Sequence, residues 1–307
     1  MKIAVQTGGI QEHYGLDGTY RLVRQCGFDA VDANLDHLVS YSDICQKRIP
    51  KVLTDGSVYS IRELSAPWRD GAKKYGIENY QAHAPFPCYI WNGNDDGYND
   101  AILRALKNSI LAANEIGCRN LVIHPFFLPY EHRLSPEDER ALNLERYSRL
   151  IPAAKEYGVT ICLENMFIRR MGKIYAACCS DIGEACGYVD ELNRIAGSDT
   201  FGFCLDTGHL LLCGLDIKDA MDRLGGRIRA FHVHDNNGID DQHLAPYMGV
   251  LDWNRFTQGL RGIEFNETMS FETFNIWNTV DAEVAPELLR FIAKCGRMFA
   301  RRAGKGE

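Results

Sequence analysis

Carboxylate and imidazole side chains stand at the ends of the short apolar runs of this sequence. Glu164 ends the run TICL, Asp206 ends FGFCL, and Glu272 ends MSF. Such runs, or the segments directly after them, hold six further candidate site residues, which are His83, His124, His209, His232, Asp241 and His243. The seventh run also carries His234 and Asp235. A charged carboxylate at the end of a buried strand must be ion-paired, hydrogen-bonded or bound to a metal. The recurrence therefore predicts one site where several such groups converge.

The mixture of oxygen and nitrogen donors indicates the class of metal that this site would hold. Carboxylates with imidazole suit a hard or borderline divalent cation such as Mn, Mg, Co or Zn. No cysteine belongs to the set, which argues against a structural thiolate zinc site. A single histidine such as His124 is as often a hydrogen-bonded core residue as a ligand. The metal prediction depends on the recurrence of these groups and not on any one of them.

Alternating strands and helices would bring these strand ends together. Strands are predicted over 2–7, 29–34, 80–85, 120–125, 160–165, 201–206, 229–235 and 268–273. Helices are predicted near 18–26, 61–76, 98–117, 136–157, 181–196, 217–224, 252–260 and 284–302. This alternation is typical of βαβ units and a parallel sheet. Eight units close naturally into a (β/α)8 TIM barrel, whose catalytic groups lie at the carboxyl ends of the strands. With no linker or low-complexity tract, we expect one domain over 1–307.

Composition restricts the partners of the protein. Its formal charge of −7 provides no general attraction to nucleic acid or to anionic membranes. The eleven cysteines are scattered through predicted strands and helices, which favours reduced thiols and a cytoplasmic location. No apolar signal segment opens the sequence, and no apolar stretch is long enough to span a membrane. We expect a small-molecule substrate and no membrane or nucleic-acid partner.

Several short motifs resemble those of the xylose isomerase-like superfamily of sugar phosphate isomerases and epimerases. The motifs occur in the family's order along nearly the whole chain. They are Glu164-Asn165, the LDTGH run from Leu205 to His209, the H-x-x-D-N of His232 to Asn236, Asp241-x-His243, and the passage from Met248 to Trp253.

The resemblance implies a ligand set, a reaction and a type of assembly. One divalent metal would be bound by Glu164, Asp206, His232 and Glu272. The two glutamates would also form an acid–base pair that moves a proton next to a carbonyl through an enediolate, with His209 hydrogen-bonded to the substrate. The substrate would be a sugar or sugar phosphate, which places the protein in carbohydrate metabolism. Proteins of this family are often homo-oligomers.

One departure from the family's pattern bears on the substrate. Ketohexose 3-epimerases carry an arginine shortly after the seventh strand, where this chain has Asn236-Asn237-Gly238. We therefore do not expect a simple free ketohexose handled in that way. Trp91 and Phe126 could pack against a sugar and Arg169 could meet a phosphate or carboxylate. These residues could equally cover the barrel rim or be solvated loop charges.

Two other activities remain open on the same scaffold. Endonuclease IV, a three-zinc phosphodiesterase of the superfamily, has metal ligands that match all nine residues of the predicted site. The acidic chain and its lack of a dense Lys/Arg run argue against a nuclease. A metal-dependent lyase or C-glycoside deglycosidase shares the first chemical step, proton removal beside a ketone. A non-catalytic binding module would have no use for two glutamates at one metal.

Overall fold

The chain forms eight parallel strands with helices between them. The structure is a computed structural model that describes residues 1–91, 93 and 97–304. The sheet has the strand order β10-β1-β2-β3-β4-β5-β8-β9, and a parallel bridge between Val233, just after β9, and Phe271 of β10 closes the row. This arrangement confirms the predicted TIM barrel. The strands are β1 (Lys2–Gln6), β2 (Ala30–Asn34), β3 (Glu78–His83), β4 (Asn120–Val122), β5 (Thr160–Glu164), β8 (Phe201–Asp206), β9 (Ile228–His232) and β10 (Thr268–Phe271).

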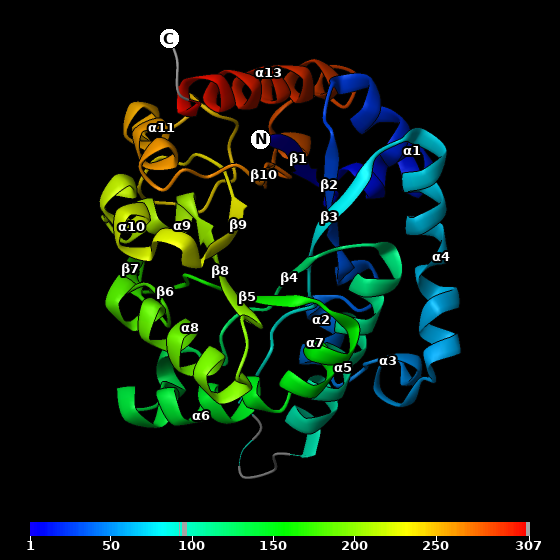
Figure 1. The fold of residues 1–307 in the computed structure, drawn as a ribbon, viewed down its shortest axis with the longest axis vertical. Helices are drawn as coiled ribbons and strands as arrows, with labels where there is room; N and C mark the ends of the chain where they lie inside the picture. The colour runs from blue at the N-terminus through cyan, green and yellow to red at the C-terminus, as the bar shows by residue number, and fades with distance from the viewer. Residues whose placement is uncertain (92, 94–96, 305–307) are drawn as a thin grey trace. The chain divides into compact units, whose positions relative to one another are not determined.

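Contacts divide the chain into two compact units. The first unit contains 1–33, 67–80 and 204–307, and the second contains 34–66 and 81–203. In the first, β1 pairs in parallel with both β10 and β2, and α13 (Ala285–Ala303) packs against α1 (Ile10–Cys26) and β1 (Figure 1). Its other helices are α9 (Thr207–Leu212), α10 (Ile217–Leu224), α11 (Trp253–Gly262) and α12 (Ile276–Thr279). The long helix α4 (Val58–Tyr75) runs from the second unit into the first.

The second unit is built on β4, which pairs in parallel with β3 and β5. Helix α5 (Gly97–Ile116) packs against α3 (Lys51–Asp55) and α7 (Ile151–Tyr157), and α6 (Pro136–Ser148) packs against α8 (Ile182–Ala196) (Figure 1). Its remaining elements are the short helix α2 (Tyr41–Cys45) and an antiparallel hairpin of β6 (Phe167–Arg170) and β7 (Lys173–Ala176). Strands β4 and β5 are buried on nearly all positions, as their continuous apolar runs predict.

Three predicted helix and loop assignments were wrong in detail. The helix predicted over 136–157 is two helices, because Pro152 in the first turn of α7 has no N–H to continue α6. The helix predicted at 18–26 begins earlier, at Ile10, and is interrupted at Gly15, where φ is 62°. The β6–β7 hairpin lies where a loop was expected. The predicted start of α6 was right, because the Ser135 hydroxyl accepts a hydrogen bond from the N–H of Asp138.

The structure gives the environment of the cysteines and the lengths of the helices. None of the eleven cysteines, all within the described residues, is in a disulfide, and most of them are buried. Within the described residues, every helix is too short or too polar to cross a membrane.

Candidate metal centre

Three of the four predicted metal ligands lie together in the first unit. Asp206 ends β8, His232 ends β9, and Glu272 directly follows β10. Each offers one ligand atom, and these three atoms lie within 4.8 Å of one another. The side chains are buried, and the Nδ1 of His232 lies 3.6 Å from Oε2 of Glu272. Ligand atoms of one divalent ion lie roughly 2.0–2.6 Å from it, so this spacing fits a single small cation.

Two of these ligands, His232 and Glu272, are in contact with other buried polar side chains. Asp32, in the middle of β2, is fully buried, and its Oδ2 lies 3.3 Å from Nε2 of His232. The same Oδ2 accepts a hydrogen bond of 3.1 Å from the Ser270 hydroxyl. The Gln6 amide donates a hydrogen bond to Oε1 of Glu272. With Nε2 of His232 facing a carboxylate, Nδ1 is the ring nitrogen that faces Glu272 and remains for a metal.

Asp206 is held by His234 and by its own backbone. The strand ends at Asp206 and α9 begins at the next residue, so the Asp206 carboxylate caps the helix by accepting from the N–H of His209 at 2.7 Å. Nε2 of His234 lies 3.0 Å from both carboxylate oxygens. Burial alone would lower the pKa of His234, but the negative charge of Asp206 and its hydrogen bond raise that pKa to about 9. The space for this ring requires Gly208, where an added Cβ would lie 2.0 Å from His234.

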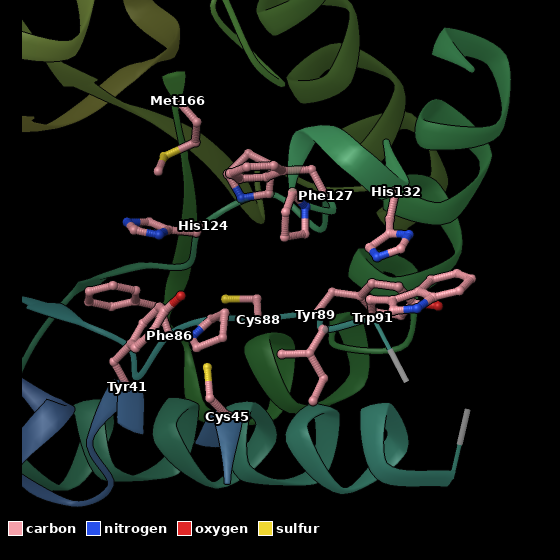
Figure 2. Close-up of a pocket in the computed structure, with 14 residues that line it drawn as sticks. Tyr41, Cys45, Phe86, Cys88, Tyr89, Trp91, His124, Phe127, His132 and Met166 are labelled. Carbon is pink, nitrogen blue, oxygen red and sulfur yellow. The ribbon is translucent and has the colours of Figure 1, made fainter. Parts of the chain in front are cut away.

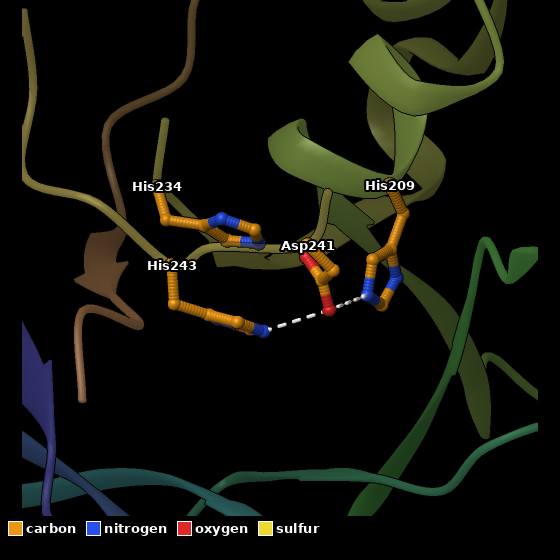
Figure 3. A group of neighbouring side chains, drawn as sticks. All are labelled: His209, His234, Asp241 and His243. Carbon is orange, nitrogen blue, oxygen red and sulfur yellow. Dashed lines mark hydrogen bonds and ion pairs between the residues drawn. The ribbon is translucent and has the colours of Figure 1, made fainter. Parts of the chain in front are cut away.

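A second cluster of metal-binding types lies in the same unit (Figure 3). His209, His234, Asp241 and His243 each offer one atom, and these atoms lie within 4.8 Å of one another. Oδ2 of Asp241 lies 3.0 Å from Nε2 of His243 and 3.5 Å from Nε2 of His209, on either side of it in Figure 3. Although burial opposes the charge, His209 holds the pKa of Asp241 well below its usual range.

Two polar atoms of this cluster are unsatisfied. Nδ1 of His234 and Oδ1 of Asp241 are buried without a hydrogen-bond partner among the residues that the structure describes. Nδ1 of His243 lies 3.0 Å from the carbonyl oxygen of Glu272, which can only accept, so this nitrogen carries the proton. A neutral His243 then presents a lone pair at Nε2 toward Asp241. Nε2 of His243 and Oδ2 of Asp241 are then two acceptors that face each other, which is favourable only when a cation binds to both or when the ring is protonated. This set of oxygen and nitrogen atoms therefore fits a metal.

The loop that carries Asp241 and His243 is anchored by Asp235. The fully buried Asp235 carboxylate accepts hydrogen bonds from the N–H of Leu251 at 3.0 Å and from the indole of Trp253 at 3.1 Å. Gly249 passes so close that an added Cβ would lie 2.2 Å from the Asn236 carbonyl oxygen. The aspartate of the H-x-x-D-N motif and the later glycine and tryptophan are thus structural residues that hold this loop in place.

The remaining predicted site residues lie together in the second unit. Nε2 of His124 is 3.3 Å from Oε2 of Glu164, and Nε2 of His83 is 3.8 Å from the same oxygen. The two Nε2 atoms are 3.0 Å apart. The carbonyl oxygen of Ala84 accepts from Nδ1 of His83 at 2.8 Å, which leaves Nε2 of His83 unprotonated in the neutral ring. Nε2 of His83 is therefore an acceptor, and Nε2 of His124 lies within reach of both this nitrogen and Oε2 of Glu164.

The three predicted substrate contacts have different surroundings. Trp91 lines a pocket of the second unit, together with Phe127. Phe126 does not line this pocket, because its side chain is fully buried with its ring 4.9 Å from the Tyr147 ring centre. Arg169 lies exposed on the β6–β7 hairpin. The substrate contact of Phe126 stays a prediction, and its neighbour Phe127 is among the aromatic residues that line the pocket.

His234 and Asp32 were not predicted as site residues, although the sequence holds indications of both. His234 follows His232 by two residues, the spacing that places side chains on one face of an extended strand. Asp32 interrupts the buried apolar run of β2, where a carboxylate needs a partner. Neither pattern identifies which group would be that partner.

Comparison with known proteins identifies the family of the fold and several similar proteins. A family model described as a xylose isomerase-like TIM barrel matches residues 20–295. The inosose isomerase of Bacillus velezensis is 25% identical over 281 residues, which cover 89% of this chain and 89% of that protein.

Two solved structures share the fold over their full length. The IOLI protein with a binding zinc atom has a TM-score of 0.70 at 19% identity and covers 100% of both chains. The D-allulose 3-epimerase from Methylomonas sp., in complex with D-allulose, has a TM-score of 0.71 at 17% identity and covers 99% of this chain and 97% of that chain.

Proposed function

The chain belongs to the xylose isomerase-like TIM barrel family, and we propose that it is a divalent-metal-dependent isomerase or epimerase of a sugar or sugar phosphate. The observation that carries this proposal is the buried group of Asp206, His232 and Glu272, whose ligand atoms lie within 4.8 Å of one another. Similar proteins named as an inosose isomerase and as a D-allulose 3-epimerase support a carbohydrate substrate.

Glu164 is the proposed fourth ligand, on the basis of its Glu-Asn motif after β5. The cation would be Mn, Mg, Co or Zn, and the zinc of the IOLI protein supports a metal of this class. When bound, the metal would polarise the substrate carbonyl and stabilise the negative charge of the enediolate. A divalent cation would offset two of the three negative charges of Glu164, Asp206 and Glu272.

Proton transfer is assigned to the two glutamates. One of Glu164 and Glu272 removes the proton from the carbon next to the carbonyl, and the other returns a proton to that carbon or to its neighbour. The Gln6 amide occupies Oε1 of Glu272, so Oε2 is the oxygen available for other contacts. His209, buried and 3.5 Å from Asp241, is assigned to a substrate hydroxyl.

The test is a panel of ketoses, aldoses and their phosphates incubated with the protein in D2O. We expect one or more of them to be interconverted with its isomer or epimer and to acquire deuterium at the carbon next to the carbonyl. Treatment with a chelator should stop both events, and one of the four metals should restore them. Interconversion that persists without metal, or a complete lack of deuterium uptake across the panel, would contradict the proposal.

A multi-zinc phosphodiesterase resembling endonuclease IV is the second candidate. The observation that favours it is the presence of two further donor groups, His83–His124–Glu164 and His209–Asp241–His243, each of which could hold a zinc ion. The net charge of −7 opposes binding to DNA. Elemental analysis separates the candidates: about one metal per chain supports the isomerase, whereas two or three zinc ions with cleavage of an abasic-site oligonucleotide would establish the nuclease.

A further inference from the structure

A pocket in the second unit differs in chemistry from the metal centre. It has a volume of about 480 Å³ and lies among the segments that follow β3, β4 and β5 (Figure 2). This volume falls within the range of roughly 300–1,000 Å³ found for cavities that bury small organic ligands. Its aromatic lining side chains are Tyr41, Phe86, Tyr89, Trp91, His124, Phe127 and His132.

The walls present flat ring faces, and the rings of the tyrosines, the histidines and Trp91 also carry a polar atom. The rings of Trp91 and His132 stack with their centres 4.3 Å apart and their planes at 9°. Phe86 lies 5.0 Å from the His124 ring and 5.7 Å from the Tyr41 ring, centre to centre. A planar aromatic ring held against such walls would gain stacked and edge-on aromatic contacts.

The lining also argues against a phosphate group in this pocket. Among the described lining residues there is no lysine or arginine to pair with an anion. Trp91 is 51% exposed, an unusual amount for the largest apolar side chain, and a ring seated on it would remove that surface from water.

His124 links the pocket to the proposed acid–base group. Its ring lines the pocket, and its Nε2 lies 3.3 Å from Oε2 of Glu164. Figure 2 shows His124 and Met166, which follow β4 and β5, on the same side of the pocket. A group held here would therefore lie next to a glutamate that the proposed function assigns to proton transfer. This continuity indicates that the occupant is part of the substrate.

We propose that the sugar substrate carries a planar aromatic aglycone and that this pocket binds the aglycone. Since the glycosidic bond removes the anomeric carbonyl, the carbonyl that the proton transfer needs would be a ketone at another carbon of the sugar. The inference rests on the proposed function, since it places the sugar at the proton-transfer residues. The aglycone would stack on Trp91 and contact Phe127. Binding through the aglycone explains why the chain lacks the arginine that ketohexose 3-epimerases carry after the seventh strand. A substrate held by its aglycone does not depend on a contact with that arginine.

The test compares two probes that differ in the aglycone, 4-nitrophenyl β-D-glucopyranoside and methyl β-D-glucopyranoside. Equilibrium binding to the full chain, loaded with metal, is measured by calorimetry. We expect the aryl glucoside to bind at least about tenfold more tightly than the methyl glucoside. Trp91→Ala should remove most of that preference, and Trp91→Phe should retain it. Phe291→Ala, at a half-exposed ring on α13 outside the pocket, is the matched control and should change nothing.

Equal affinity for the two probes, or an aryl preference that survives Trp91→Ala, would overturn the inference. Binding of 4-nitrophenol alone as tightly as its glucoside would also overturn it, because the pocket would then recognise a free aromatic molecule. Different results would refute the proposed function and the aglycone pocket. Deuterium uptake by free sugars without an aryl preference refutes only the aglycone pocket, while an aryl preference without any metal-dependent proton transfer refutes the proposed function and leaves the pocket's preference standing.

Discussion

At the scale of single residues, each proposed ligand of the first unit is in contact with a second buried polar group. Asp32 faces His232, Gln6 donates to Glu272, and Nε2 of His234 faces Asp206. Such partners fix the orientation and the protonation of metal ligands, and their loss typically lowers metal affinity about 10–100-fold. These partners were not predicted, because the sequence does not show which buried polar groups come into contact.

Asp32→Asn tests this supporting role. The amide keeps the size of the side chain but removes the charge that faces Nε2 of His232. We expect the affinity for Mn or Zn to fall about 10–100-fold while the circular dichroism spectrum is unchanged. Competition with a fluorescent chelator measures the affinity. Asp70→Asn, at an exposed position of α4, is the matched control, and equal affinities of the two variants would show that Asp32 does not support the ligand.

Gly208→Ala tests the close packing of the His234 ring. An alanine ordinarily stabilises a helix by about 0.5–1 kcal/mol relative to glycine, but here its Cβ would lie 2.0 Å from the imidazole. We expect a loss of about 1–3 kcal/mol in the free energy of unfolding, measured by urea titration. Gly187→Ala in α8, whose Cβ would meet only an Arg140 atom at 3.9 Å, should instead stabilise the protein. Stabilisation by both changes would refute the proposed clash.

At the scale of elements, regular sequence patterns predicted the strands well, whereas the elements in irregular segments were not predicted. The buried runs of β5 and β8 identified the strands and the residues Glu164 and Asp206 at their ends. The β6–β7 hairpin was missed because Phe167 to Ala176 mixes charged and apolar residues without strict alternation. The break between α6 and α7 could have been predicted from Pro152, since a proline inside a helical pattern ends the preceding helix.

The loop from Asn236 to Leu251 provides a test at this scale. Asp235→Ala removes the acceptor of the Leu251 N–H and the Trp253 indole, and leaves both donors buried and unpaired. We expect a loss of about 2–4 kcal/mol in the free energy of unfolding and faster amide hydrogen exchange across the loop. Asp240→Ala, an exposed position of the same loop, is the control. Unchanged exchange in Asp235→Ala would mean that other contacts hold the loop.

At the scale of the whole molecule, the barrel explains why widely spaced residues could be assigned to one site. Parallel strands all end at the same edge of a closed sheet, so residues as far apart in sequence as Asp206 and Glu272 were expected to meet, and their ligand atoms do lie within 4.8 Å. The aromatic pocket could not be expected in the same way. Its lining comes from loops and from α2, whose paths have no periodic pattern in the sequence.

The central claim is that Glu272 transfers a proton at a metal-bound sugar. The most direct measurement compares the rate of deuterium uptake from D2O, next to the carbonyl of the turned-over sugar, in the wild type and in Glu272→Gln. The glutamine keeps a carbonyl oxygen for the metal but cannot act as a base. We predict a rate at least about 10²-fold lower, with a melting temperature within a few degrees of the wild type in excess metal. Deuterium uptake at the wild-type rate in a folded, metal-loaded Glu272→Gln protein would contradict the account.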